Sequence, residues 1–268
     1  MTVQELPPIG LGTYGVEPAR CTAAVATALQ LGYRHVDTAE MYENEAAVGD
    51  ALAASSVDRE DVFVATKVHS THLSYDDVLA AVERSRRRLG VDAVDCCYVH
   101  WPIRTYDAAE TLAAFDELSD RGTIRRVGLS NFTPELLADA LDHLEAPLFA
   151  HQVECHPLLP QNELRRLARE HDHSLVAYSP LAKGTATEVP ELVEVADRRG
   201  ATPAQVSLAW LLSKENVVAI PKSTSRTHLR ENLAAADLDL DERDLALIDG
   251  IERRERQVDV PEAPWNRS

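Results

Sequence analysis

The feature that most constrains the fold of this chain is a repeated alternation of short apolar segments with amphipathic ones. The apolar segments predict β-strands at about residues 9–11, 34–36, 62–66, 94–99, 124–129, 148–153, 174–178 and 217–221. Each precedes a predicted helix, at about residues 19–31, 45–53, 75–89, 108–119, 134–144, 163–171, 204–213 and 226–235. Alternating βα units predict a parallel sheet covered by helices. Eight such units in 268 residues favour one α/β domain over residues 1–268, a closed (β/α)8 or TIM barrel, with extra helices near residues 191–199 and 242–252.

Composition narrows the classes of function. The formal net charge is −17, which argues against binding to nucleic acid or to an anionic membrane surface. No apolar run approaches the roughly 18 residues of a membrane span, and residues 1–8 lack the basic and apolar regions of a signal peptide. The four cysteines form no Cys-x-x-Cys pair, which favours reduced thiols in a cytoplasmic protein.

Lysine is rare in this chain. Of the 27 basic residues, only four are lysines and the others are arginines. The lysines are Lys67, Lys183, Lys214 and Lys222. A surface rich in Asp and Glu and nearly free of Lys is typical of a halophilic protein. An ordinary acidic protein from a GC-rich genome would have the same composition through codon bias, so both interpretations stay open.

Polar side chains stand where three successive predicted strands end. Asp37 ends the second strand and Tyr42 follows it in the same turn, Lys67 ends the third strand, and His100 ends the fourth. The carboxyl ends of parallel barrel strands open onto one face, so we expect these four side chains to meet there. Packing or solvation would explain any one of them alone, but an active site better explains the set.

The chemistry of this set suits proton transfer to a carbonyl oxygen. Tyrosine has an ordinary pKa of about 10 and therefore holds its proton at pH 7. A lysine about 4 Å away would favour the phenolate by about 4 kcal/mol at an effective dielectric of ~20, which would lower the Tyr42 pKa by up to roughly three units before desolvation opposes the shift. Asp37 would keep Lys67 charged, and His100 would orient the carbonyl. We therefore predict carbonyl reduction, with hydride from a nicotinamide and a proton from Tyr42.

Residues 32–45 also resemble the first signature of the aldo-keto reductase family, through their glycine, aromatic, Asp-Thr-Ala, Tyr and Asn-Glu pattern. With later motifs the resemblance covers about residues 9–232, and it is strongest to small prokaryotic members that are similar to diketogluconate reductases. It implies NAD(P)H-dependent reduction of aldehydes or ketones. The catalytic tetrad of the family falls on Asp37, Tyr42, Lys67 and His100.

The resemblance further implies a nicotinamide cofactor site along the strand ends. The residues so implied are Thr13 near the nicotinamide ribose, Ser130, Asn131 and Gln152 around the carboxamide, Tyr178 on the ring, Ser179 and Leu181 at the pyrophosphate, Lys222, Ser223 and Ser225 around the adenosine 2'-phosphate, and Glu231 and Asn232 at the adenine.

Two positions depart from the family pattern. His228 stands where the family usually has an arginine. Arginine is always charged and binds phosphate bidentately, whereas histidine is mostly neutral at pH 7. We therefore expect NADP(H) to be bound with weaker discrimination and NAD(H) to be accepted as well; whether Arg226 supplies the missing charge stays open. His151 stands where the family usually has Asn, and no consequence is predicted from it.

The resemblance places Tyr14, Trp101 and Trp265 at the substrate mouth. Trp101 could instead plug the barrel rim, and Trp265 could instead pin the C-terminal tail. The short loops favour a small carbonyl substrate over a large one such as a steroid, and we expect a monomer.

The pairs His69-x-x-His72 and His171-x-His173 are weak metal signals with no acidic ligand spaced to complete them, so no metal is expected.

Three alternatives remain to be weighed. The pattern Gly10-x-Gly12-x-x-Gly15 imitates a dinucleotide-binding fingerprint, but prolines break the strand that should precede it and the helix begins late. An alcohol or sugar dehydrogenase working in the oxidative direction would use the same residues. A cofactor-binding, redox-sensing regulatory subunit would share the fold, although a complete tetrad argues against it.

Overall fold

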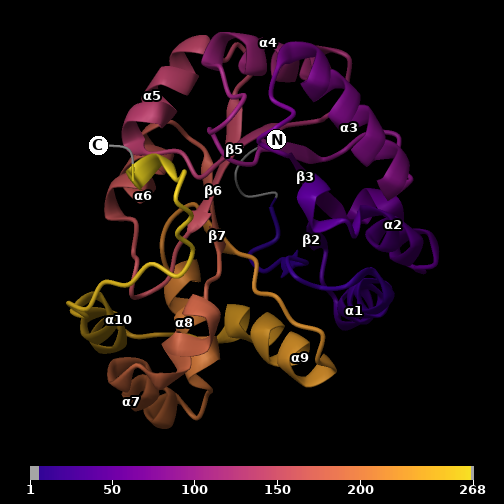
Figure 1. Cartoon of the computed structure of the whole chain (residues 1–268). Helices are drawn as coiled ribbons and strands as arrows, with labels where there is room; N and C mark the ends of the chain where they lie inside the picture. The colour runs from indigo at the N-terminus through magenta and orange to yellow at the C-terminus, as the bar shows by residue number, and fades with distance from the viewer. Residues whose placement is uncertain (1–5, 267–268) are drawn as a thin grey trace.

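The computed structural model describes residues 6–266, so the prediction of no signal peptide falls partly outside the described residues. One sheet of eight parallel strands in sequential order forms the centre, and helices surround it (Figure 1). The strands are β1 (Leu11–Gly12), β2 (His35–Asp37), β3 (Phe63–Val68), β4 (Cys96–Val99), β5 (Val127–Ser130), β6 (Leu148–Glu154), β7 (Ser174–Tyr178) and β8 (Val217–Ala219).

The sheet closes on itself between its first and last strands. Ile9 and Ala219 form a parallel bridge, and the Gly10 N–H donates to the Ala219 carbonyl at 2.8 Å. The Ala219 N–H in turn donates to the carbonyl of Pro8 at 3.0 Å. The predicted (β/α)8 barrel is therefore confirmed, and the strand ends that carry the candidate residues share one face.

The helices fall within a residue or so of the predicted ranges for most elements. They are α1 (Pro18–Leu31), α2 (Glu45–Ala53), α3 (Tyr75–Leu89), α4 (Ala108–Asp120), α5 (Pro134–His143), α6 (Asn162–Glu170), α7 (Pro190–Arg199), α8 (Pro203–Leu212), α9 (Arg226–Ala234) and α10 (Glu242–Asp249). Local signals set several starts, because proline occupies the first turn of α1, α5, α7 and α8.

Three strands begin two or three residues later than their apolar runs: β1 starts at Leu11 rather than Ile9, and β4 and β5 are also late. Val94 and Ile124 pair with each other only in an isolated bridge, so β4 and β5 start two and three residues beyond the predicted positions. At the other end β3 extends through Val68, which places Lys67 inside the strand rather than after it. An apolar run therefore marked the buried segment and not the length over which the ladder of hydrogen bonds forms.

Two apolar cores result from the alternation of side chains along each strand. Ala65, Cys96 and Tyr98 point into the barrel and pack with residues of β6 to β8. Cys97 and Val99 point outward and join the larger core between sheet and helices. This period of two is what a sheet buried on both faces requires.

The glycines near the start of the chain serve strand packing. A Cβ on Gly10 would lie 2.5 Å from His35 Nδ1, and one on Gly12 would lie 2.7 Å from the carbonyl oxygen of Ile220. These contacts explain why side chains are absent where β1 meets β2 and β8. The sequential strand order excludes the doubly wound sheet that a dinucleotide fingerprint would require, so that alternative is wrong.

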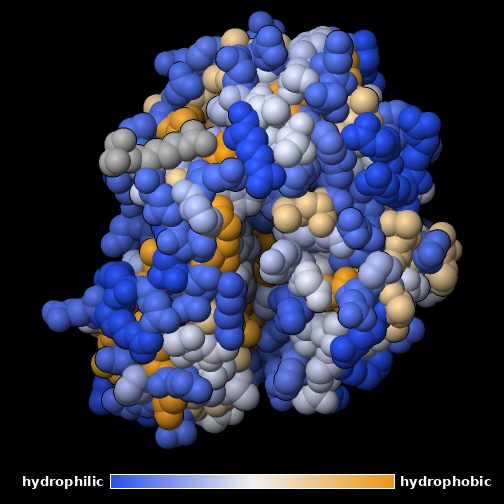
Figure 2. Space-filling model, in the orientation of Figure 1, coloured by the Kyte–Doolittle hydropathy of each residue, from blue (hydrophilic) through white to orange (hydrophobic). Residues whose placement is uncertain are grey.

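The outer surface agrees with the composition. Hydrophilic residues dominate the face shown in Figure 2, which is hollowed near its centre. All four cysteines are free thiols and buried. Within residues 6–266, no helix is long and apolar enough to cross a bilayer.

Candidate active site

Asp37 and Lys67 form a buried ion pair at the carboxyl ends of β2 and β3. The Lys67 ammonium donates to Asp37 Oδ1 at 2.5 Å and to the Thr38 carbonyl at 2.7 Å. The other carboxylate oxygen of Asp37 accepts from Gln152 Nε2 at 2.7 Å. Both charged side chains are at most 2% exposed. Such a pair is held in place because separating it would leave an unpaired charge inside the protein.

Tyr42 and His100 complete the group that the sequence predicted to meet. Tyr42 ends the short 3-10 helix η2 (Glu40–Tyr42), and the Lys67 ammonium lies 5.0 Å from the centre of its ring. The ring of His100, directly after β4, is 5.7 Å from that of Tyr42, centre to centre. The four predicted residues therefore surround one point at the end of the barrel.

Glu40 braces the turn that carries Tyr42. Its carboxylate accepts the backbone N–H of His69 at 3.0 Å and hydrogen bonds to His72 Nδ1 at 3.1 Å. Arg84 on α3 adds a third contact at 3.2 Å. His69 and His72 are therefore spaced so that both contact the carboxylate of Glu40. The sequence pattern did not single out Glu40 because its partners lie about thirty or more residues away.

The Asn-Glu pair that follows Tyr42 is structural. Asn44 Oδ1 accepts a hydrogen bond from the Thr38 hydroxyl at 2.7 Å. Asn44 Nδ2 donates to the carbonyls of Thr13 and Val16, both at 3.0 Å. Glu45 accepts from the Thr66 hydroxyl at 2.6 Å. These contacts tie the loops after β1 and β2 to each other and the start of α2 to β3, which fixes the turn around the site.

The resting pKa of Tyr42 differs from the sequence-based expectation. Burial raises the pKa of this phenol well above its usual value, and the negative charge of Asp37 adds to the rise. The expected lowering by Lys67 does not appear, because the ammonium is already neutralised by Asp37 at 2.5 Å. Tyr42 thus keeps its proton throughout the physiological pH range.

His100 is neutral at physiological pH. Burial lowers its pKa well below the usual 6.5, and the positive charge of Lys67 lowers it further. Its Nδ1 atom has no hydrogen-bond partner among the described residues. A neutral imidazole can donate one hydrogen bond but is a poor acid, whereas the protonated phenol of Tyr42 beside it retains a proton to give.

Four side chains expected at the nicotinamide form a connected wall beside the tetrad. The Tyr178 hydroxyl donates to Asn131 Oδ1 at 2.8 Å, and Asn131 Nδ2 donates to the carbonyl of His100 at 2.9 Å and to Ser130 Oγ at 3.0 Å. Ser130 pairs in register with Gln152 across β5 and β6. The Tyr178 ring is half-buried and anchored at its hydroxyl, which leaves a fixed aromatic surface beside polar groups.

His151 lies on the opposite side of β6 from Gln152. It is fully buried, and its Nε2 accepts the backbone N–H of Phe132 at 3.3 Å. Its departure from the family pattern is thus a packing feature between sheet and helices, without contact to the tetrad.

The residues expected at the adenosine end gather at the start of α9. Ser225 caps this helix and Ser223 Oγ accepts the Ser225 N–H at 3.1 Å, while Lys222 and His228 are exposed. Arg20 on α1, which the sequence did not indicate, reaches the same loop by donating to Thr224 Oγ1 at 3.1 Å.

The other residues that were predicted to bind the cofactor lie on the loops after β1 and β7 and on α9. Thr13 is buried and donates through Oγ1 to the Asp37 carbonyl at 3.0 Å. Ser179 has a left-handed backbone with φ 47° in the turn after β7, and Leu181 directly precedes the 3-10 segment η4 (Ala182–Glu188). Glu231 is half-buried and Asn232 is buried on α9.

The three expected substrate residues lie around Tyr42 and His100. Tyr14 is 63% exposed, and its ring centre lies 5.2 Å from that of Tyr42. Trp101 follows His100, and its ring centre lies 5.5 Å from that of Trp265. Trp265 also donates to Asp259 Oδ1 at 2.9 Å, so it ties together two parts of the C-terminal tail.

A buried carboxylate anchors the C-terminal tail (residues 250–266), which Figure 1 shows in yellow running back from α10 across the barrel. Glu154, at the end of β6, accepts the backbone N–H groups of Gln257 at 2.6 Å and Val258 at 2.8 Å. His156 adds a contact to the same carboxylate at 2.9 Å. Lys183 ties the loop after β7 to the carbonyl of Gln257 at 2.8 Å.

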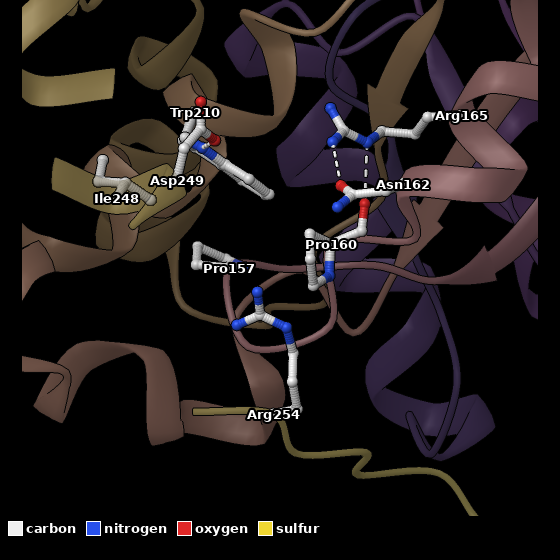
Figure 3. Close-up of a pocket in the computed structure, with 8 residues that line it drawn as sticks. All are labelled: Pro157, Pro160, Asn162, Arg165, Trp210, Ile248, Asp249 and Arg254. Carbon is white, nitrogen blue, oxygen red and sulfur yellow. Dashed lines mark hydrogen bonds between the residues drawn. The ribbon is translucent and has the colours of Figure 1, made fainter. Parts of the chain in front are cut away.

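A separate pocket of about 260 Å³ lies at the root of this tail. Figure 3 shows its lining, which comes from the loop after β6 and from α6, α8 and α10: Pro157, Pro160, Asn162, Arg165, Trp210, Ile248, Asp249 and Arg254. None of the tetrad residues lines it, so it is distinct from the candidate active site.

Comparison with known proteins identifies the family. The model of the Aldo/keto reductase family matches residues 8–253. An aldo-keto reductase of Mycolicibacterium smegmatis is 39% identical over 252 residues, covering 94% of this chain and 91% of that protein. The methylglyoxal reductase DkgB of Escherichia coli O157:H7 is 36% identical over 256 residues, covering 94% and 96%.

Solved structures agree. The crystal structure of a provisionally assigned 2,5-diketo-D-gluconic acid reductase B has a TM-score of 0.93 and 36% identity, covering 96% of this chain and 92% of that one. Aldose reductase from Schistosoma japonicum has a TM-score of 0.91 and 29% identity, covering 98% and 94%. The chain therefore belongs to the aldo/keto reductase family, whose members are oxidoreductases that act on carbonyl and alcohol groups.

Proposed function

We propose that this protein reduces small aldehydes or ketones to alcohols with NAD(P)H, and that Tyr42 is the general acid. The observation that carries the proposal is a protonated phenol held between a buried Lys67–Asp37 pair and a neutral His100. Four buried free cysteines fit a cytoplasmic enzyme. We also propose that the enzyme is a single-domain monomer.

Each member of the tetrad has a separate task in this proposal. His100 donates a hydrogen bond that orients the substrate carbonyl toward Tyr42. The phenol then gives its proton to the developing alkoxide, a base comparable to the conjugate base of water, whose pKa is about 15.7. The raised pKa of Tyr42 therefore does not prevent this transfer. Lys67 stabilises the phenolate that remains, and Asp37 holds Lys67 in position.

The wall beside the tetrad fits a nicotinamide cofactor, which would supply the hydride. Tyr178 offers an aromatic surface anchored through Asn131, and polar atoms of Ser130, Asn131 and Gln152 lie next to it. At the far end the start of α9 offers backbone N–H groups next to Lys222, an arrangement that suits a phosphate.

For the choice between the two cofactors we propose NADP(H), with NAD(H) accepted as well. His228 is an exposed histidine and cannot act as a permanent cation. Two arginines lie near the loop before it, since Arg20 contacts Thr224 and Arg226 contacts Gln30 Oε1 at 3.4 Å. They could compensate in part by attracting a 2'-phosphate, which supports a modest rather than a strong preference for NADPH.

Oxidation of NADPH and NADH with methylglyoxal or another small aldehyde tests the proposal, because the relative from Escherichia coli O157:H7 is a methylglyoxal reductase. We expect turnover with both cofactors at comparable catalytic efficiency. A preference for NADPH above about 100-fold, nearly 3 kcal/mol, would contradict the assignment of His228. Repeating the assay with and without molar KCl tests whether the acidic surface reflects a halophilic protein.

The alternatives predict different results in this assay. A dehydrogenase that works oxidatively would turn over alcohols with NADP+ or NAD+ far better than aldehydes with the reduced cofactors. A redox-sensing regulatory subunit would bind the cofactor tightly without turnover under any salt. The assembled tetrad favours an enzyme over the regulatory subunit, and the relative rates in the two directions separate the reductase from the dehydrogenase.

A further inference from the structure

Arg256, in the C-terminal tail, is a half-buried cation without an acidic partner. Its guanidinium lies over the ring of Trp265, with the central carbon 3.8 Å from the ring centre. No carboxylate oxygen of residues 6–266 lies within 4 Å of its nitrogens, although its charge acts on Asp259 at longer range. A guanidinium stacked on an aromatic face keeps the N–H groups at its edge available for a ligand.

The other arginines of the mouth and tail are engaged. Arg104 pairs with Glu262 at 3.0 Å, and Arg253 pairs with Glu255. Arg254 points into the pocket at the root of the tail (Figure 3) and donates to the carbonyls of Ile251 and Arg253. Arg34 and Arg165 are also half-buried without a carboxylate, but both donate to backbone carbonyls. Among residues 6–266, Arg256 has neither kind of partner, which points to a ligand.

Two ring contacts link Arg256 to the segment that carries His100. Trp265 beneath it packs on Trp101 with 5.5 Å between ring centres, and Trp101 directly follows His100. Burial raises the pKa of Tyr178, and the positive charge of Arg256 opposes this rise, which places the guanidinium within electrostatic reach of the site. An anion bound at Arg256 would therefore stand at the mouth while another part of the same molecule reached Tyr42.

We propose that Arg256 binds a carboxylate on the substrate, so that the enzyme prefers carbonyl compounds carrying an acid group. This inference rests on the proposed reductase function. A planar carboxylate matches the fork of one guanidinium and balances its single charge. A dianionic phosphate would need a second available cation, and the other cations at the tail are engaged: Arg104 pairs with Glu262, and Lys183 donates to the carbonyl of Gln257 at 2.8 Å. Arg256 would be a specificity residue and take no part in proton transfer.

Steady-state kinetics with two matched aldehydes tests the proposal. We would compare 4-carboxybenzaldehyde with 4-nitrobenzaldehyde, a neutral analogue of similar size, in the wild type and in Arg256→Gln. The expected result is a KM for the carboxylated aldehyde raised by about 10- to 100-fold at little change in kcat, as for the loss of a charge-assisted hydrogen bond. The neutral aldehyde should change by less than about twofold. Arg256→Lys should lie between, because it keeps the charge without the fork.

Arg253→Gln is the matched control, because this neighbouring arginine is exposed and paired with Glu255. It should leave both aldehydes unaffected. Equal loss with both aldehydes in Arg256→Gln would overturn the proposal and indicate a disturbed tail. A raised KM for NADPH with unchanged aldehyde kinetics would also overturn it, and would assign Arg256 to the cofactor.

A binding measurement separates failure of this inference from failure of the reductase function. Calorimetry with 4-hydroxymethylbenzoate in the presence of NADP+ needs no turnover. Binding to the wild type that weakens about tenfold or more in Arg256→Gln, and also weakens in molar KCl, would support the carboxylate site even if neither aldehyde were reduced. Equal binding by the wild type and Arg256→Gln would overturn it.

Discussion

The buried base of the candidate site, here called the floor, and the surface around its opening, the mouth, are stabilised by opposite kinds of contact. At the floor, Asp37 and Lys67 come from adjacent strands, are almost fully buried, and are held by direct hydrogen bonds. At the mouth, the tail is held by an exposed ion pair between Arg104 and Glu262 and by stacked aromatic rings. The side chains of that ion pair are 42% and 54% exposed, so it contributes little to stability.

The difference separates chemistry from specificity. The barrel fixes Asp37 and Lys67, because the strands that carry them cannot shift without breaking the sheet, and Tyr42 stands beside them on the short helix η2. The tail touches the barrel strands chiefly through one buried carboxylate, Glu154. Changes in the tail can therefore alter which substrate enters while the floor stays unchanged.

The largest expected effect comes from breaking the buried pair. Lys67→Met removes the cation and leaves Asp37 charged inside the barrel. We expect the free energy of unfolding to fall by about 3–5 kcal/mol, as for other broken buried pairs, together with loss of activity. Urea denaturation measures the first effect directly.

Arg104→Gln is the matched change at the mouth. It removes an exposed pair and should cost less than about 1 kcal/mol. Equal losses in the two variants would mean that floor and mouth do not differ as described. The double variant Lys67→Met with Asp37→Leu should recover part of the lost stability, because no unpaired charge remains.

Acid should destabilise the barrel through its buried histidines. Burial lowers the pKa of His35 and His173 to about 4, and that of His151 to about 3. Each stays neutral in the folded protein but gains a proton in the unfolded chain below pH 6.5. Their stabilisation is therefore complete above pH 6.5 and is lost as the pH falls, by about 3 kcal/mol per histidine down to pH 4.

A single substitution checks this acid sensitivity. Both ring nitrogens of His173 are buried without a hydrogen-bond partner among the described residues, so His173→Phe removes a titrating group and no hydrogen bond. Thermal melting between pH 7 and 4 should show a shallower decline for the variant. An unchanged pH dependence would show that this histidine does not titrate on unfolding.

Release of the tail should affect substrate binding more than catalysis. In Glu154→Gln the amide has one acceptor oxygen for the two N–H donors of Gln257 and Val258. We expect KM for aldehydes to rise about tenfold with little change in kcat, in line with the loss of one charge-assisted hydrogen bond. Trypsin should also cut faster at the arginines of the tail.

Glu255→Gln serves as the comparison for that variant, because this carboxylate pairs with Arg253 outside the barrel. It should leave both KM and the rate of trypsin cleavage near those of the wild type. If Glu154→Gln behaved in the same way, the tail would not depend on its buried anchor.

The smallest expected effect is that of pH on the chemical step. The pKa of Tyr42 lies well above 10 and that of His100 well below 6.5, so neither group changes charge between pH 7 and 9. The rate of hydride transfer, followed by stopped flow, should vary by less than about twofold over this range. A steady decline above pH 7 would instead indicate a tyrosine whose pKa Lys67 has lowered.

The floor of the site was readable from the sequence, because its residues stand at strand ends. Asp37, Lys67 and His100 each follow an apolar run, and parallel strands of a barrel bring such positions to one face. Eight alternating units were enough to predict the closed sheet. The strand limits were less accurate, since Val94 and Ile124 are apolar but stand outside the regular ladder.

The mouth was not readable in the same way. Glu154 holds a backbone group 103 residues further along the chain, and Arg256 stacks on Trp265 within the tail; no local spacing marks either contact. The direction of the pKa shift of Tyr42 was also mispredicted, although its protonated state was not, because the effect of Lys67 depends on where Asp37 lies and on how deeply the phenol is buried. The tail contacts and the pKa of Tyr42 both depend on burial and on neighbours that are distant in the sequence or unspecified by it.

The most direct test of the central claim is single-turnover oxidation of NADPH by Tyr42→Phe with a small aldehyde. Loss of the phenolic hydroxyl should slow hydride transfer by about 10²–10⁴-fold, the usual contribution of a general acid. NADPH binding, followed by its fluorescence, should stay within about twofold of the wild type, because the cofactor wall does not depend on that hydroxyl. A transfer rate within about tenfold of the wild type would contradict the assignment of Tyr42 as the proton donor.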